Sequence, residues 1–370
     1  MPELLDLLDK ADWQFAVCNS CRYCEGYCAV FPAAEKMPAI GIAELTQLSN
    51  LCHECRACYQ ACMYAPPHEF GVNIPELLSD ARGASYRRFA WPGWLRPALA
   101  RPWGTVALAA GAGTVAALLA AVAGAGISGI GAAGSGPGAF YTVVGQWAMT
   151  GGGLVLGLVP LLVLIACFWR FWTAMGGTGR QLLDLRSYRA TLVDVAGLRY
   201  LGGGGGGCYY PDAASPSRAR RALHQAVVAG FVLAFASTTV AAFEQHVLGI
   251  LPPYSLLSAP VLLGTAGGLL LIVGGGGLLL LRAREGEVDH TLASPASRAL
   301  SVSFLGLLLW IAATGLLLLA LRGTGAMGPL LILHLGAVAG LFLTVPYGKL
   351  LHAIPRFAAL WRYNLSRRES

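Results

Sequence analysis

Six long apolar runs constrain the fold of this chain more than any other feature of its sequence. They cover residues 105–127, 148–171, 225–246, 257–281, 300–321 and 330–351. Each exceeds the roughly 20 residues that an α-helix needs to cross the hydrocarbon core of a bilayer, and none carries a charge at its centre. We therefore predict a membrane domain of six transmembrane helices over residues 91–370, which sets the chain apart from ordinary soluble enzymes.

The charges between these runs predict an orientation in the lipid bilayer. Arg and Lys precede the first run and follow the second, fourth and sixth, whereas the segments after the first and third runs contain none. Under the positive-inside rule both termini lie in the cytoplasm. The expectation is a multi-pass protein of the inner (cytoplasmic) membrane, with residues 172–222 forming a cytoplasmic loop.

The first 90 residues form a separate, acidic part of the chain. They hold 11 of the 19 acidic residues but only 7 of the 26 basic ones. The formal net charge of +7 therefore reflects the basic loops of the membrane domain, and no nucleic-acid partner is expected. The acidic start MPELLDLLDK lacks the features of a secretory signal. We predict a cytoplasmic domain over residues 1–90.

Two identical cysteine motifs of the form C-x2-C-x2-C-x3-C lie in this acidic domain. They are Cys18, Cys21, Cys24, Cys28 and Cys52, Cys55, Cys58, Cys62. Three thiolates at this spacing can wrap one corner of a cubane, and the fourth then reaches the other cluster. This predicts two [4Fe–4S] clusters with crossed fourth ligands, Cys62 completing the first set and Cys28 the second. A zinc site is the alternative, although zinc does not need the third closely spaced cysteine.

The surroundings of the motifs favour helices. Neither fourth cysteine is followed by Pro, and the residues between the motifs have a helical character. The predicted fold class is therefore all-α, with an N-terminal α-helical ferredoxin-like domain that holds two [4Fe–4S] sites, followed by a six-helix transmembrane bundle. The run Gly202–Gly207 formally matches a dinucleotide-binding motif, but no βαβ pattern surrounds it. A flexible loop or close backbone packing is the favoured interpretation.

Four histidines lie at the ends of the third and sixth apolar runs, where imidazoles indicate function by default. His224 and His352 fall on the cytoplasmic side, His246 and His334 on the outer side. The 18 residues from His334 to His352 equal five turns, which places both on one face of a continuous helix. Each pair could supply two axial ligands to one haem. No C-x-x-C-H motif is present, so the haem would be b-type.

Basic residues accompany these histidines. Arg221 and Lys349 lie a turn from the inner pair, and Arg322 lies on the outer side. They could hold haem propionates, although anchoring to anionic lipid would need the same residues. Interfacial histidines without haem are the alternative for the four imidazoles.

The chain resembles the tricarballylate utilization protein B family, also called the citrate utilization protein B family. The resemblance rests on CNSCRYCEGYCAVFPA, LCHECRACYQACMYAPPHEFGVNIP, LRYLGGGGGGCYYPD, ALRGTGAMGPLLILHLG and TVPYGKLLHAIPRFAALWR. It implies a membrane partner of a cytoplasmic FAD-dependent dehydrogenase that oxidises a tricarboxylate. The resemblance carries over the eight cysteines, His334 and His352 as ligands. At the position of His224 the family often has two adjacent histidines, and in this chain Leu223 replaces the first of them.

The predicted function is electron transfer from this flavoprotein through two [4Fe–4S] clusters and one or two b haems to the membrane quinone pool. The chain is expected to act as an oxidoreductase component without a substrate-oxidising centre of its own. A haem and iron–sulfur partner of a flavoprotein oxygenase in cobalamin (precorrin) biosynthesis is the alternative. A transporter or sensor is less favoured, because no acidic residue lies in the centre of an apolar run.

Overall fold

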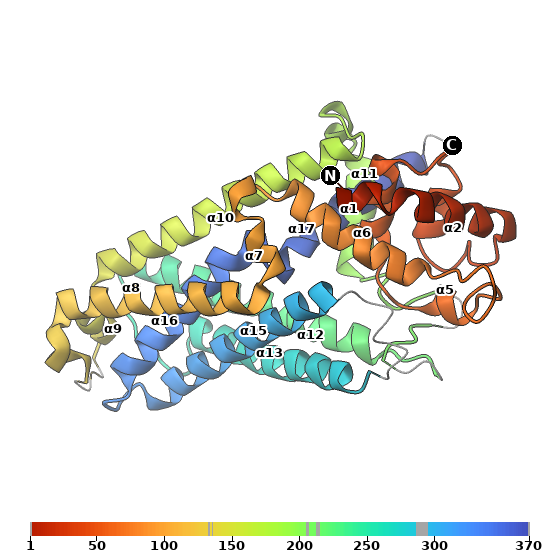
Figure 1. The fold of residues 1–370 in the computed structure, drawn as a ribbon. Coiled ribbons are helices and arrows are strands. Elements are labelled where there is room, and N and C mark those ends of the chain that lie inside the picture. Colours follow the sequence, from red (N-terminus) through yellow and green to blue (C-terminus); the bar gives the residue numbers. More distant parts are fainter. Residues whose placement is uncertain are drawn as a thin grey trace.

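The computed structural model describes residues 2–131, 134, 136–204, 207–211, 215–285 and 295–368. Every regular element in these ranges is a helix, which confirms the predicted all-α class. Short N-terminal helices gather at one end of a bundle of long helices (Figure 1). We call residues 2–90 the head, the adjoining end of the bundle the head end, and the opposite end the far end.

Six long helices form the bundle. They are α8 (Pro102–Ile130), α10 (Gln146–Ala174), α12 (Ala219–His246), α13 (Ala259–Ala283), α15 (Pro295–Leu321) and α16 (Met327–Thr344). All six are long and apolar enough to cross a membrane, and each contains most of one predicted run. The chain is therefore a multi-pass membrane protein. Shorter elements follow α16, namely η3 (Val345–Tyr347), η4 (Lys349–His352) and α17 (Ala353–Ser366).

The sixth helix ends before the sixth apolar run does. α16 ends at Thr344, because Pro346 offers no N–H to continue the helix and Gly348 adopts an extended conformation. The chain then turns through two short 3-10 helices. The prediction that His334 and His352 share one continuous helix is therefore wrong, since a break separates them.

The head is built from six short helices around a small apolar core. They are α1 (Pro2–Leu5), α2 (Leu8–Cys21), α3 (Val30–Ala34), α4 (Ile42–Leu51), α5 (Ala57–Gln60) and α6 (Ile74–Phe89). Leu45 and Leu48 of α4 and Leu77 and Leu78 of α6 are completely buried. Asn73 caps α6 by accepting a hydrogen bond from the backbone N–H of Glu76 at 3.2 Å. These two helices support the cysteine segments on either side of them.

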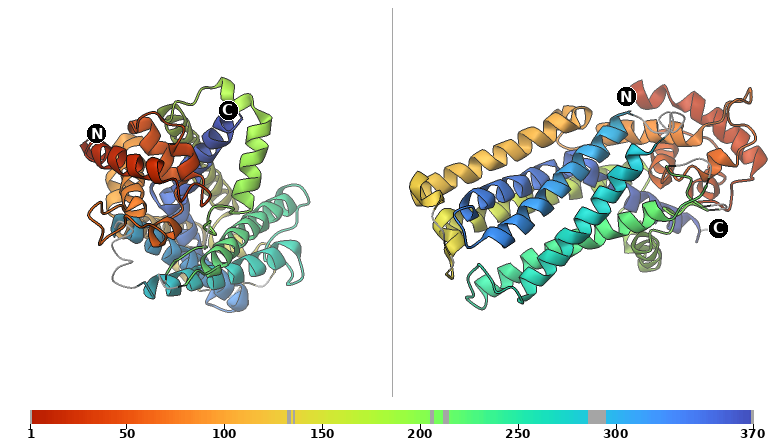
Figure 2. Two further views of the ribbon diagram at one scale, coloured as in Figure 1. Left: turned by 90° about the vertical axis from the view of Figure 1, so that its right-hand side faces the viewer. Right: turned by 90° about the horizontal axis from the view of Figure 1, so that it is seen from below.

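The core of the head continues into the bundle. Phe89 of α6 packs on Phe171 of α10, with ring centres 5.1 Å apart. The neighbouring Trp172 contacts Trp361 of α17 at 5.3 Å. Figure 2 shows the head seated across the head end of the bundle, with the C-terminal helix beside it. One shared hydrophobic core therefore holds the cysteine domain against the membrane helices.

The connections between the long helices contain further short helices. They are η1 (Gly93–Leu95), α7 (Pro97–Ala100), α9 (Ala139–Val143), η2 (Arg180–Leu183) and α11 (Leu185–Ala196). α11 lies in the segment predicted as a loop and packs against α17, where Asn364 donates to Thr191 at 3.1 Å. Part of this segment is therefore ordered as helix.

Glycines bring the long helices into close contact. A Cβ atom on Gly230 of α12 would lie 2.8 Å from the backbone oxygen of Gly267 on α13. A Cβ on Gly336 of α16 would lie 2.6 Å from Cα of Thr114 on α8. Without a hydrophobic driving force in lipid, helices associate through such close backbone approach. This packing accounts for part of the chain's 48 glycines.

Candidate functional site

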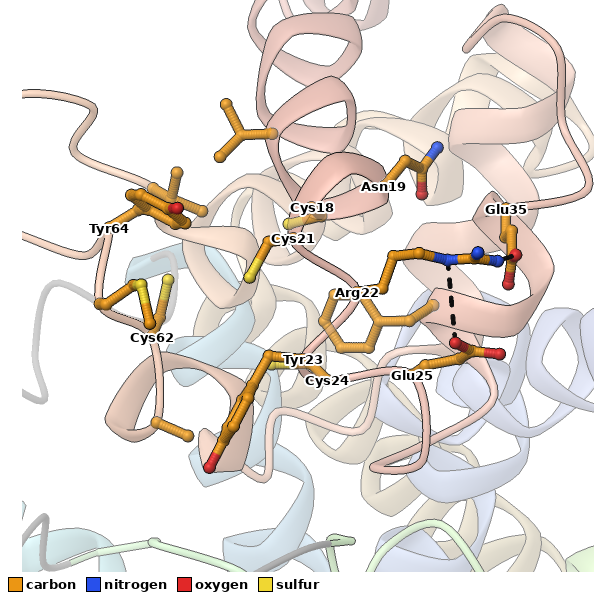
Figure 3. A pocket seen from close by; sticks show the side chains of 15 residues that line it. Cys18, Asn19, Cys21, Arg22, Tyr23, Cys24, Glu25, Glu35, Cys62 and Tyr64 are labelled. Atoms are coloured by element: carbon orange, nitrogen blue, oxygen red, sulfur yellow. Dashed lines mark ion pairs between the residues drawn. The ribbon is translucent and has the colours of Figure 1, made fainter.

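The first four-cysteine set lies at the end of α2 (Figure 3). Cys18, Cys21, Cys24 and Cys62 line one cavity. Arg22 ends the helix in a left-handed conformation, with its N–H bonded to the carbonyl of Cys18 at 2.7 Å. The chain therefore turns back immediately after Cys21, which brings Cys24 to the same cavity. Cys21 is exposed, so this set reaches the surface of the head.

The second set surrounds a cavity deeper in the head. Its lining includes Cys28, Cys52, Cys55 and Cys58. Each cavity thus takes three cysteines from one motif and the fourth from the other, in the grouping that the spacing predicts. Among the described residues no three His, Cys, Asp or Glu side chains form a group placed to hold a single metal ion. The thiols of each set line a cavity and do not converge on the position of one metal ion.

Burial favours the neutral form of thiols in both sets, among them Cys18, Cys24 and Cys58. Burial, with contributions from Cys62, Cys24 and Cys21, raises the pKa of Cys18 to about 12. Burial also raises the pKa of Cys24 to about 11 and that of Cys58 well above its usual value. Crowded thiolates need a compensating positive charge, which bound metal supplies as it displaces the protons. The donor set therefore fits a metal cluster.

The second cysteine set lies against the membrane domain. The backbone N–H of Tyr209 donates to the carbonyl of Cys55 at 2.9 Å, and Arg220 of α12 donates to the carbonyl of Glu54 at 2.7 Å. A Cβ on Gly204 would overlap the backbone carbonyl of Tyr27. Gly204 of the glycine run thus packs closely on the head, whereas Gly205 and Gly206 lie outside the described residues.

His224 and His352 meet at the head end of the bundle. Their ring centres are 6.3 Å apart and their planes are nearly perpendicular, at 88°. A metal between two imidazoles, each bound at about 2 Å, would separate the ring centres by roughly 6 Å. Nδ1 of His352 contacts the carbonyl of Lys349, which fixes that nitrogen as the donor and leaves Nε2 free to bind metal. The predicted inner pair is thus brought together.

His334 and His246 have different surroundings. Nδ1 of His334 lies 3.1 Å from Oγ1 of Thr314, and the imidazole lines a cavity of about 410 Å³ together with Arg322. His246 is exposed at the end of α12 and is not among the residues that line this cavity. The structure therefore places the predicted outer pair in separate surroundings.

A cluster of cations lies between the second cysteine set and the histidine pair. Glu54 faces Arg82 at 2.5 Å. Although burial raises its pKa, the charges of Arg82, Lys349, Arg220 and Arg356 hold the pKa of Glu54 well below its usual range. Three arginines, together with Lys349, thus surround one carboxylate, an excess of positive charge that suits an anionic partner.

The buried environment affects two members of this cluster, Lys349 and Arg356. Burial lowers the pKa of Lys349 to about 7. Nε and Nη1 of Arg356 are buried without a hydrogen-bond partner. Sequence reasoning identified Lys349 but not Arg356, whose position one turn after His352 was the available signal. Arg221, the second candidate propionate ligand predicted beside the inner pair, donates to the carbonyl of Gly197.

The architecture defines a class: a multi-pass membrane protein with a cysteine-rich, ferredoxin-like head. Residues 11–88 match the Citrate utilization protein B Fer4-like domain, and residues 97–370 match Citrate utilization protein B. The chain is 38% identical over 357 residues to "Citrate utilization protein B" of Escherichia coli, covering 95% of this chain and 90% of that protein. The chain therefore belongs to the Citrate utilization protein B family, as its resemblance predicted. No solved structure matches it.

Proposed function

We propose that this chain is a membrane electron-transfer protein that reoxidises a cytoplasmic FAD-dependent dehydrogenase of the tricarballylate type and delivers the electrons to the quinone pool. Two [4Fe–4S] clusters and b haem would supply the one-electron chemistry. The observation that carries this proposal is the order of the sites. An exposed cysteine set, a second set at the junction and a histidine pair follow one another from the head into the bundle.

The exposed set suits the role of electron entry. Cys21 reaches the surface, and Tyr23 and Met63, which line the same cavity, are each more than 60% exposed. A partner can therefore approach this set closely. The head is acidic, with 11 acidic and 7 basic residues in its first 90 positions, which favours a partner with a basic docking surface.

The histidine pair suits the role of haem binding. Nε2 of His352 is available, and burial lowers the pKa of this histidine well below its usual value, so the imidazole is in its neutral, metal-binding form. Lys349 and Arg356 would hold the propionates, because their buried charge exceeds the nearby negative charge.

The proposed partner follows from the family. The relative in Escherichia coli is named for citrate utilization, and citrate and tricarballylate are both tricarboxylates. This chain would accept electrons while the flavoprotein binds and oxidises the tricarboxylate. Six spans give the chain direct access to the lipid phase, where quinones dissolve.

A variant at the inner histidine tests this function. His352→Ala should remove the low-spin haem absorbance of the purified, detergent-solubilised protein, because it deletes one of two axial ligands. Iron, acid-labile sulfide and the iron–sulfur EPR signals should remain, since His352 does not line either cysteine cavity. A His352→Ala protein with its low-spin haem intact would refute the inner site.

A further inference from the structure

A large cavity lies between the α12–α13 pair and the α15–α16 pair, separate from the cysteine sets and from the His224–His352 pair. Its volume is about 410 Å³, within the size range of cofactor sites. The lining is mainly apolar, and the four helices supply nearly all of it. Gly264 and Gly268 of α13 and Gly315 of α15 contribute small surfaces that leave room for a flat group.

His334 projects an available nitrogen into this cavity. The hydroxyl of Thr314 has two backbone acceptors, the carbonyls of Trp310 at 2.8 Å and Ile311 at 3.1 Å. When it donates to either, its oxygen can accept from Nδ1–H of His334 at 3.1 Å. This contact sets the tautomer and leaves the Nε2 lone pair free, as in metal-binding histidines. The ring also lies against Gly315, where a Cβ would come within 2.9 Å of Cε1.

The cavity contains a cation at its far end. Arg322 follows α15 and lines the cavity, and it donates one hydrogen bond to the carbonyl of Tyr254. A guanidinium has five N–H donors, so further donors remain for a carboxylate. An imidazole in the apolar cavity and an Arg in its lining match the iron and the propionates of a haem.

The lining provides no second imidazole for the opposite side of an iron. Ser237 donates to the carbonyl of Pro260 at 2.7 Å, and Thr238 to that of Ala234 at 3.2 Å. The hydroxyl of Tyr254 donates to the carbonyl of Ala241. His334 is the one histidine among these lining residues, all of which belong to the described ranges. His246 is exposed elsewhere.

We propose that this cavity is a second b-haem site in which His334 is the single protein ligand and the sixth coordination position is open. The inference rests on the proposed electron-transfer function and extends it. Phe231 lines the cavity and lies seven residues after His224 on α12, which is about 10 Å of helix. The edge of this cavity therefore lies about two helical turns from the inner site.

A lipid-soluble quinone is the competing occupant, and the tautomer disfavours it. A quinone carbonyl needs a hydrogen-bond donor. Arg322 could supply one, whereas Nε2 of His334 could not, because it is an acceptor when Nδ1–H bonds to Thr314. An iron needs the lone pair that this tautomer provides. In this tautomer the imidazole itself suits a metal rather than a quinone carbonyl.

The test compares haem content and carbon monoxide binding in the full-length protein in detergent. The wild type should contain two b haems per chain, and its dithionite-reduced form should show a carbon monoxide difference spectrum from one of them. Oxidised protein should show a high-spin ferric EPR signal beside the low-spin signal of the inner site. His334→Gly should lose one haem, the high-spin signal and the carbon monoxide response, and added imidazole should restore all three.

Other variants separate the possible failures. His246→Ala should retain both haems and the carbon monoxide response. Loss of a haem in that variant, or a wild type with two haems and no carbon monoxide response, would overturn the open site. A wild type with a single low-spin haem, unchanged in His334→Gly, would also overturn the open site. Loss of quinone-analogue binding in that variant would then identify a quinone as the occupant of the cavity. A wild type without any haem would overturn the proposed haem chemistry as well.

Discussion

At the scale of single residues, three left-handed backbone conformations shape the cysteine loops. Arg22, Glu54 and Arg56 have φ values of 58°, 54° and 63°, and each lies between two cysteines of one motif. Such conformations are uncommon outside glycine and cost about 1–3 kcal/mol each. Their position indicates that the loops are bent so that successive thiols face one cavity, which a regular helix would not allow.

The crossed grouping of the cysteines can be tested by single substitutions. Cys62→Ser should remove the same EPR signal as Cys18→Ser, because both residues line the exposed cavity. Iron and sulfide should fall by about half in each variant. Cys52→Ser provides the matched comparison, since Cys52 belongs to the same motif as Cys62 but lines the other cavity. If Cys62→Ser resembles Cys52→Ser, the cysteines are grouped by motif.

At the scale of elements, helix pairing determines which side chains can meet. Close contacts between glycines and the neighbouring backbone hold α12 against α13, as at Gly230 and Gly267. A cavity remains between this pair and α15–α16. The break after Thr344 then redirects the chain, so that His352 reaches the start of α12. Both histidine environments therefore depend on where helices end and pair.

The α12–α13 contact can be tested with two glycines on one helix. Gly267→Val should lower the thermal stability of the purified protein, because a Cβ there would lie 2.8 Å from the backbone nitrogen of Ala234. Overpacking of this kind costs about 1–3 kcal/mol. Gly276→Val is the control, since nothing lies within 4 Å of a Cβ at that position. Equal melting temperatures for the two variants would show that the close contact is unimportant.

At the scale of the whole molecule, buried charges join the head to the bundle. Arg56, between two cysteines of the second motif, pairs with Glu285 just after α13 at 3.0 Å, with both side chains at most 2% exposed. Arg298 of α15 approaches the same carboxylate at 3.1 Å. Breaking a buried pair leaves an uncompensated charge, so these contacts couple the cysteine domain to the membrane helices.

Neutralising this carboxylate should weaken the junction. Glu285→Gln should destabilise the protein by about 3–5 kcal/mol, measured by denaturant unfolding in detergent, and the second cysteine set should lose its iron first. Glu25→Gln is the matched control, because the Arg22–Glu25 pair is more than half exposed and worth about 0–1 kcal/mol. If Glu285→Gln and Glu25→Gln unfold at the same denaturant concentration, the buried pair contributes little to stability.

The sequence alone predicted the helical class, the six spans and the grouping of the eight cysteines. These features depend on local patterns, namely the length of apolar runs and the spacing of thiols along a turn. It did not predict the end of α16 at Thr344, because the run stays apolar through Pro346. Arg356 was also missed as a partner of the histidine site, since a basic residue beside a membrane span has an ordinary explanation in the positive-inside rule.

The pairing of the histidines shows what the local sequence pattern can predict and what it cannot. The sequence determined that four imidazoles lie near the ends of two spans. The sequence also predicted the pairing of His224 with His352, which the structure brings together. Only the tertiary structure decided that His334 lines a cavity without His246. The reason is physical: a ligand pair requires side chains from different helices to face each other, and this depends on helix breaks and on neighbours chosen by close packing.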